Sequence, residues 1–273
     1  MSSLPILPIL LGLLAVGTAN AGSDCPAPEQ ASYAGRATSA LFAPLAETGL
    51  PALHTMLEQR TDCPIELHDY PTARAWSLFA AGNLDIVLGA IETPERSADG
   101  EFVEFGSIPF LLATSKRWGL MPPSQLSELE QRPLEVVGVV RGTRFPGTIQ
   151  LALQGLEAQS RVDYSVEYAI ALKKLKLGRI QLLATNLAVL LMEVPPEHLR
   201  DDLNVVEPAN TPRLKVGVYL SKKSLSPRQR DSLRKELQGM RTEGLLQRYV
   251  APRIGPANAS LIFGHSHPPE LAK

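Results

Sequence analysis

The chain is poor in cysteine and aromatic residues, and it has almost no net charge. Of its 273 residues only two are cysteines, Phe, Trp and Tyr make up 5%, and 27 basic against 28 acidic side chains give a formal net charge of -1. The missing basic excess argues against a nucleic-acid-binding protein, which normally carries one. Because aromatic residues are few, the core must be built mainly from Leu, Ala, Val and Ile.

The overall composition is that of a globular protein. Hydrophobic residues make up 44% and charged residues 20%, which excludes a disordered chain and a coiled coil. Gly and Pro are frequent but follow no period, so a collagen-like repeat is excluded as well. The length suits one large domain or two lobes of about a hundred residues each.

The N-terminal segment has the features of an export signal. Residues 1–21 carry no charge, and an apolar stretch over residues 4–16 leads to Ala19-Asn20-Ala21, the small-x-small pattern that signal peptidase reads. This stretch is shorter than the roughly 20 residues that a membrane span needs. We therefore predict a signal peptide over residues 1–21, with an N-terminal membrane anchor as the alternative.

The two cysteines are Cys25 and Cys63. An even number of cysteines in an exported chain suggests one disulfide. Two separate buried thiols are the alternative. No nearby histidine forms a recognisable catalytic pair with either cysteine.

Helical and extended patterns alternate along the chain, which predicts an α/β fold. Residues 187–193 fit a short helix or a strand, and the proline-containing residues 252–273 predict a partly ordered extension. We expect helices over residues 50–60, 72–81, 148–156, 165–177, 226–240 and 244–249, and strands or extended segments over 65–70, 85–91, 105–113, 135–140, 180–184 and 215–220.

Four short motifs follow one another in a set order. Residues 82–96 combine a helix-ending Gly, an apolar strand and Thr93-Pro94-Glu95-Arg96, and residues 137–143 combine a strand with a Gly-Thr turn. Residues 175–180 read Leu-Lys-Leu-Gly-Arg-Ile, and residues 217–244 combine a strand with a long helix. In this order the motifs resemble the type II periplasmic solute-binding proteins, the bacterial extracellular solute-binding protein family 3.

The resemblance implies two α/β lobes joined by two crossover strands, with a ligand held between them by hinge closure. The crossovers are expected near residues 110–113 and 213–216. The first lobe then comprises residues 22–112 together with residues 214–273, which include the C-terminal extension. Residues 113–213 form the second lobe.

The resemblance also implies a ligand contact from Arg96, which in amino-acid-binding members pairs with the ligand carboxylate. A planar guanidinium grips a carboxylate with two parallel hydrogen bonds. The alternative is a salt bridge to Glu92 or Glu95. Thr93 belongs to the same cleft-facing turn.

In the second lobe the expected contacts are Thr143, Arg144 and Asn186. Thr143 would offer its hydroxyl and N–H at a helix start, where anions bind, or act as a plain N-cap. Arg144 adds positive charge to the cleft or lies in solvent. Asn186 stands where many α-amino-acid binders carry the Asp that takes the ligand ammonium, and a neutral amide cannot balance a buried cation in this way.

A further strand-to-helix turn at the cleft edge carries Tyr70 and Arg74. Tyr70 could stack on a ligand or hydrogen-bond to it. Arg74 is a second candidate for anion contact, with a surface position as the alternative. Trp76 is expected in the core.

We therefore predict an exported, monomeric, periplasmic solute-binding protein that captures a small polar ligand between two lobes. The ligand is expected to be anionic or to carry a carboxylate, and the partner to be an inner-membrane transporter or a sensor. No catalytic residue, metal, cofactor or nucleic-acid partner is expected. The alternatives are a dehydratase-like enzyme on the same fold, using Glu92 or Glu95, and a ligand-free interaction module.

The disulfide can be tested on protein purified from an exporting host. Non-reducing mass spectrometry is expected to find a chain that begins at Gly22 and lacks two thiol hydrogens. Because the bond closes a 38-residue loop, its reduction should lower the free energy of unfolding by on the order of 3–4 kcal/mol. Two free thiols in the native protein would contradict it.

Overall fold

The computed structural model describes residues 29–34, 36–44 and 51–264. The predicted signal peptide and Cys25 lie outside the described residues, so the cleavage and the Cys25–Cys63 disulfide stay predictions. No helix of the described part is long and apolar enough to cross a bilayer.

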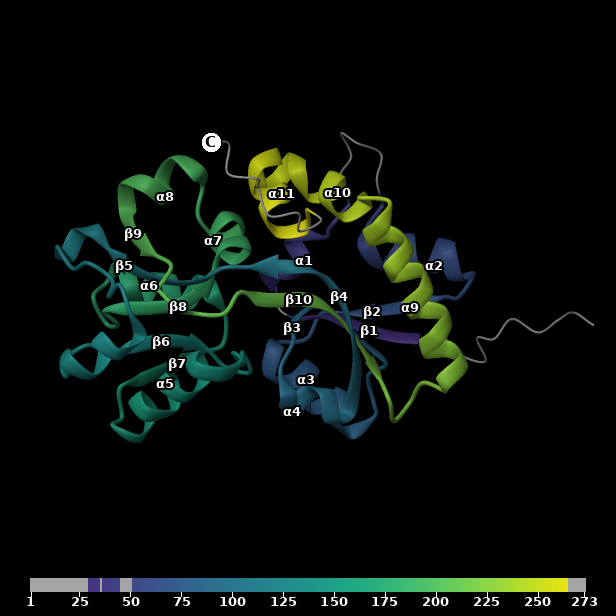
Figure 1. Cartoon of the computed structure of the whole chain (residues 1–273), viewed down its shortest axis with the longest axis horizontal. Coiled ribbons are helices and arrows are strands. Elements are labelled where there is room, and N and C mark those ends of the chain that lie inside the picture. The colour runs from purple at the N-terminus through teal and green to yellow at the C-terminus, as the bar shows by residue number, and fades with distance from the viewer. Residues whose placement is uncertain (1–28, 35, 45–50, 265–273) are drawn as a thin grey trace, which may run out of the picture.

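The structure has two five-stranded sheets lying side by side, each with its own helices (Figure 1). The strand order of the first sheet is β2 (Ile65–His68), β1 (Glu29–Tyr33), β3 (Ile86–Ile91), β10 (Leu214–Ser221) and β4 (Gly100–Ile108). In this sheet β1 runs parallel to its neighbours β2 and β3, and β10 runs antiparallel to β3 and β4. We refer to this sheet and its helices as lobe 1.

The second sheet forms lobe 2, and its order is β7 (Val162–Ser165), β6 (Val137–Val140), β8 (Leu182–Asn186), β5 (Phe110–Ser115) and β9 (Leu203–Val206). The chain passes between the sheets at Pro109 and again within residues 207–213. The predicted α/β architecture of two lobes with two crossovers is therefore confirmed. The lobe limits assigned from the sequence stay a prediction.

Helices cover both sheets, and local sequence explains several of their ends. Gly82 ends α3 in the left-handed conformation with φ 78°, and Ser226 caps α9 in a capping box with Gln229. Lobe 1 carries α1 (Arg36–Leu41), α2 (Leu53–Thr61), α3 (Thr72–Ala81), α4 (Pro94–Asp99), α9 (Pro227–Thr242), α10 (Leu245–Ile254) and α11 (Pro256–Phe263), and lobe 2 carries α5 (Gly147–Ala158), α6 (Tyr168–Lys176), α7 (Leu187–Glu193) and α8 (Pro196–Asp202).

The described part of the predicted C-terminal extension contains helices that the sequence did not indicate. Helix α10 continues through Pro252 to Ile254, and α11 follows over Pro256–Phe263. Pro256 stands in the first turn of α11, where its missing N–H costs nothing. The helix is too short to show a clear period in sequence, and it forms because Ile262 and Phe263 are buried against lobe 1.

One helix start was also predicted wrongly. Residues 162–165 form strand β7, so the helix expected from residue 165 begins only at Tyr168. Pairing of β7 with the neighbouring strand β6 outweighs the local helix signal at Ser165. At the start of α3, the Thr72 hydroxyl donates to the Ala34 carbonyl at 3.1 Å, and Pro71 is the N-cap residue.

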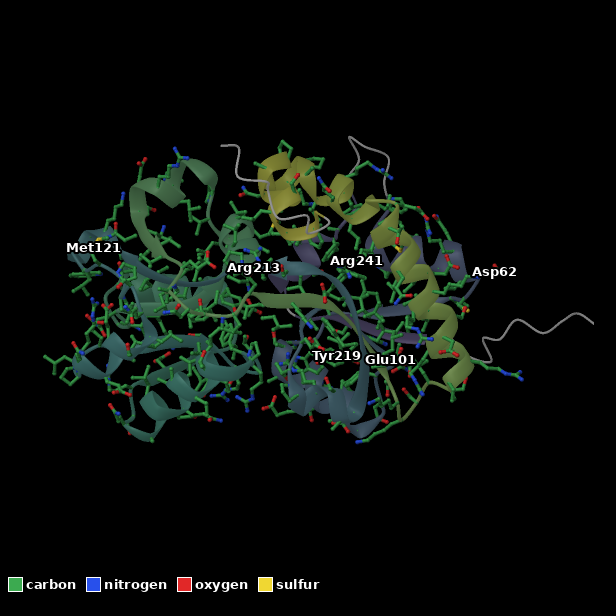
Figure 2. The ribbon with its side chains drawn as sticks, viewed as in Figure 1. Asp62, Glu101, Met121, Arg213, Tyr219 and Arg241 are labelled. Atoms are coloured by element: carbon green, nitrogen blue, oxygen red, sulfur yellow. The ribbon has the colours of Figure 1, made fainter. Side chains whose placement is uncertain are left out.

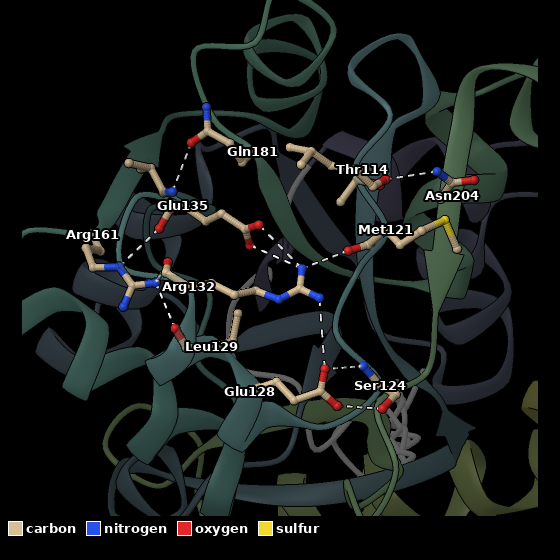
Figure 3. A network of polar contacts seen from close by, with 12 residues as sticks. Thr114, Met121, Ser124, Glu128, Leu129, Arg132, Glu135, Arg161, Gln181 and Asn204 are labelled. Carbon is tan, nitrogen blue, oxygen red and sulfur yellow. Dashed lines mark hydrogen bonds and ion pairs between the residues drawn. The ribbon is translucent and has the colours of Figure 1, made fainter.

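Lobe 2 contains a buried arginine whose guanidinium is hydrogen-bonded to several nearby acceptors (Figure 3). Arg161 is 6% exposed. Its guanidinium donates to the carbonyls of Leu129, Arg132 and Glu135 and to the Gln159 side chain, at 2.5–3.1 Å. It thereby fixes the short 3-10 segment Leu126–Gln131 to the edge of the sheet.

In lobe 1 the turn before α4 is held by a tyrosine from a distant strand. The Tyr219 hydroxyl accepts from the Thr93 N–H at 2.9 Å and donates to the Thr93 carbonyl at 3.1 Å, and both residues are fully buried. Figure 2 shows Tyr219 inside lobe 1. This double contact sets the position from which α4 and its Arg96 begin.

Tyr219→Phe should therefore lower the free energy of unfolding in urea by about 1–3 kcal/mol, since it leaves a buried N–H without a partner. Tyr164→Phe is the matched control. Its hydroxyl bonds Glu157 at the surface at 3.0 Å, so its loss should change stability by no more than about 0.5 kcal/mol. Equal stabilities of the two variants would contradict the role assigned to Tyr219.

Candidate functional site

A cavity of about 70 Å³ lies between the lobes. Lobe 1 provides most of its wall, through β1, β3, β4, β10, α3, α4 and the segments around α1 and α11. The lining residues of lobe 1 are Ala34, Leu41, Phe42, Thr72, Trp76, Gly89, Ile91, Arg96, Phe105, Ile108, Val216, Gly217, Ile262 and Phe263, and those of lobe 2 are Thr143, Tyr168, Asn186, Ala188 and Val189.

The strand pairing of the lobe 1 sheet is irregular at two places, and both lie at the cavity wall. The pairing between β10 and β3 skips Gly89, and the pairing between β10 and β4 skips Phe105. Both skipped residues line the cavity. A β-bulge redirects side chains and bends its strand, so the adjacent bulges shape the sheet where it faces lobe 2. Gly89 has φ 67°, a conformation that favours glycine.

Arg96 is the only charged residue lining the cavity among the residues that the structure describes. Its guanidinium lies over the Trp76 ring, 3.7 Å from the ring centroid. It donates to the Ile91 carbonyl at 3.2 Å and, across the lobes, to the Gly142 carbonyl at 2.7 Å. Burial lowers the pKa of Arg96 from its ordinary value, and the positive charge of Arg144 adds to this effect.

The surroundings of Arg96 differ from those of Arg161. Four of the five N–H groups of Arg161 are bonded, whereas Arg96 uses two of its five within the described residues. The alternative ion pairs are not formed, because Glu92 pairs with Lys215 at 3.2 Å and Glu95 is exposed. Arg96 is thus a cation at the cavity wall with unused donors and no carboxylate from the described chain.

The lobes touch at the turn that follows β6. Gly142 has φ 88°, and a Cβ on it would lie 2.6 Å from both the N and the Cα of Ala73 in α3. The lobe 2 backbone therefore packs directly on the N-terminal turn of a lobe 1 helix. Together with the bond from Arg96, this contact holds the lobes closed around the cavity.

Lobe 2 contributes three polar side chains, and each already has a partner. Asn186 caps α7 by accepting from the Val189 N–H at 3.0 Å. Thr143 and Tyr168 hydrogen-bond to each other through their side chains. Burial raises the pKa of Tyr168 to about 12, so its hydroxyl stays protonated at neutral pH. Thr143 precedes α5 by a turn and does not cap it, because Pro146 occupies that position.

The structure thus brings Arg96, Thr143 and Asn186 of the sequence-predicted set to one cavity. The others lie elsewhere in the described structure. Thr93 is buried beneath the wall against Tyr219, and Arg144 contacts the Tyr164 hydroxyl. Arg74 lies over the ring of Tyr70, 5.3 Å from its centroid, and neither lines the cavity.

Sequence reasoning missed most of the apolar wall. Trp76, assigned to the core, lines the cavity beneath Arg96. Phe105 and Ile108 come from β4, and Ile262 and Phe263 come from the C-terminal helix. The apolar character of residues 105–113 was visible in sequence, but which side chains face the cavity depends on the bulge and the crossover.

The part of the chain that the structure describes contains no group of three or more His, Cys, Asp or Glu side chains that could hold a metal ion.

No protein-family model and no curated protein matches the sequence. Solved structures do match it. An amino acid ABC transporter substrate-binding protein from Streptococcus pneumoniae, bound to L-arginine, has a TM-score of 0.64 at 16% identity, covering 86% of this chain and 96% of its own. The chain has the two-lobed periplasmic-binding-protein fold. EhuB in complex with hydroxyectoine shares this fold, with a TM-score of 0.66 at 17% identity, covering 85% of this chain and 90% of its own. A histidine kinase sensor domain shares it too, with a TM-score of 0.65 at 14% identity, covering 84% of this chain and 96% of its own.

The comparisons therefore confirm the predicted periplasmic-binding-protein fold. The cavity described above lies between the two lobes of this fold.

The lobe contact gives a test of closure. Gly142→Ala should force the lobes apart, because its Cβ has no room against Ala73, and small-angle X-ray scattering should show a larger radius of gyration. Gly147→Ala is the matched control, since Gly147 also has positive φ, 55°, but nothing lies within 4 Å. Both variants should lose about 1–2 kcal/mol of stability. An unchanged radius in Gly142→Ala would refute the contact.

Proposed function

We propose that this protein is an exported solute-binding protein that holds a small anionic or carboxylate-bearing ligand between its lobes, at Arg96. One observation carries the proposal: a charged guanidinium lines the interlobe cavity with no carboxylate partner among the described residues. Burying a charge is costly unless it is paired. An anion in the cavity would supply the missing partner and accept from the unused N–H groups.

The neighbouring structures bind ligands of different charge. Their bound ligands include arginine, glutamine, L-glutamate and hydroxyectoine. An amino-acid or basic ligand needs an acceptor for its positive charge. Among the described lining residues Arg96 alone is charged, and the Asn186 oxygen already accepts a hydrogen bond as a helix cap. These features favour an anion over an ordinary α-amino acid.

Arg96 would also couple ligand binding to closure. Its guanidinium contacts lobe 1 through Ile91 and lobe 2 through Gly142. A ligand anion bound to the same guanidinium would orient it for the bond across the lobes. The anion and the Gly142 carbonyl use different N–H groups, so they do not compete.

The geometry favours binding over catalysis. The enzyme alternative rests on Glu92 and Glu95, but neither carboxyl lines the cavity, and Glu92 is paired with Lys215.

We infer that the mature chain acts as a monomer in the periplasm after cleavage near Ala21. Its partner would be an inner-membrane transporter or a sensor. A substrate-binding protein of an ABC transporter and a sensor domain of a histidine kinase both have this fold.

The proposal can be tested by thermal shift and calorimetry on the mature protein. The probes are acetate, pentanoate, benzoate, succinate, phosphate, sulfate, L-arginine, L-glutamine and hydroxyectoine. At least one anion is expected to stabilise the fold, by about 2.7 kcal/mol at one hundred times its Kd. Arg96→Ala should abolish the effect, and Arg96→Lys should weaken it because a lysine cannot bind bidentately.

Arg74→Ala is the control, because Arg74 lies against Tyr70 outside the cavity, and it should keep wild-type binding. If only L-arginine, L-glutamine or hydroxyectoine stabilises the protein, the anionic ligand is refuted. If no probe does so, the ligand-free interaction module replaces the proposal.

A further inference from the structure

The cavity wall offers a ligand ammonium no carboxylate. Among the described residues the lining contains no Asp or Glu. The Asn186 oxygen already accepts from the Val189 N–H, and Thr143 lies beside the Tyr168 hydroxyl. A positively charged amino group would therefore lie beside the Arg96 cation with only neutral polar groups in the described lining, which do not offset the cost of burying a second positive charge.

The remainder of the wall is apolar, and it is formed by side chains from several elements of lobe 1. Among the described residues, the large lobe 1 side chains at the cavity other than Arg96 and its platform Trp76 carry no polar group. They are Leu41, Phe42, Ile91, Phe105, Ile108, Ile262 and Phe263. A ligand body in contact with this surface gains free energy by leaving water only if the body is itself apolar.

Helix α11 supplies part of this apolar wall, and it is held in a fixed place. A Cβ on Gly106 would lie 2.0 Å from the Ile262 carbonyl oxygen, so the helix packs directly on the β4 backbone. Arg213, between the lobes in Figure 2, donates to the carbonyls of Ser107 and Leu261 at 2.8 and 3.0 Å. Phe263 also packs edge-on against Phe42, with ring centroids 6.3 Å apart.

The cavity is small. A volume of about 70 Å³ has room for several water molecules, since one water needs roughly 10–15 Å³. This size suits a compact ligand body of a few carbon atoms.

From these observations we propose that the ligand is a small monocarboxylate with an apolar body and no amino group. Its carboxylate lies at Arg96, and its body lies against the wall that includes α11. This inference rests on the proposed function, because it takes the anion at Arg96 as given. It adds the chemical class of the rest of the ligand and assigns size selection to Ile262 and Phe263.

The test measures the Kd values of a homologous series on the full mature protein by calorimetry. The probes are acetate, propanoate, butanoate, pentanoate and hexanoate, with norvaline as the 2-amino counterpart of pentanoate and succinate as a dicarboxylate. Each added methylene is expected to tighten binding about fourfold, equivalent to about 0.8 kcal/mol, until the cavity is full. Norvaline and succinate should bind at least tenfold more weakly than the best monocarboxylate.

Variants of α11 test the wall itself. Phe263→Ala should shift the optimum to a longer chain. Leu261→Ala is the matched control, because this side chain is 51% exposed and does not line the cavity, and it should keep the wild-type optimum. If Phe263→Ala fails to fold, Ile262→Val gives a milder enlargement with the same expected direction.

The outcomes separate this inference from the function on which it rests. If norvaline or succinate binds more tightly than every monocarboxylate, or if affinity does not rise with chain length, the inference is overturned while an anion site at Arg96 stands. If Arg96→Ala has no effect on any anion, the proposed function fails. An unshifted optimum in both wall variants overturns the role of α11.

Discussion

A single buried guanidinium connects the two halves of this protein. Arg96 lies on the Trp76 ring and donates to one carbonyl from each lobe. A cation removed from water must be compensated by dipoles or by an opposite charge. The two carbonyls supply part of this compensation and join the lobes, and the other N–H groups have no partner among the described residues.

The scaffold around Arg96 is rigid because its contacts are made by residues from distant parts of the chain. Tyr219 of β10 holds the Thr93 backbone at the start of α4, and the bulges at Gly89 and Phe105 adjust the sheet next to it. Gly142 permits the close approach of lobe 2, since only a residue without Cβ fits against Ala73. Each contact is specified by one residue type for a steric or hydrogen-bonding reason.

The chemistry of the cavity follows from what surrounds the charge. Arg161 shows that this chain can bury an arginine by surrounding it with acceptors. Arg96 has fewer acceptors, and the cavity that it lines also has apolar side chains from β4, α1 and α11 in its wall. This arrangement, one cation beside an apolar wall, is what a recognition site for a small amphiphilic anion requires.

The sequence by itself determined the alternation of strands and helices, because apolar periodicity and caps such as Gly82 and Ser226 act locally. The order of its motifs led to the two-lobed fold and to Arg96, Thr143 and Asn186. Only the tertiary structure decided that Tyr70 and Arg74 lie outside the cavity and that the C-terminal residues Ile262 and Phe263 form its wall. A local pattern shows which face of an element is apolar. It cannot show which distant elements will meet, since that depends on bulges, crossovers and packing between residues far apart in the chain.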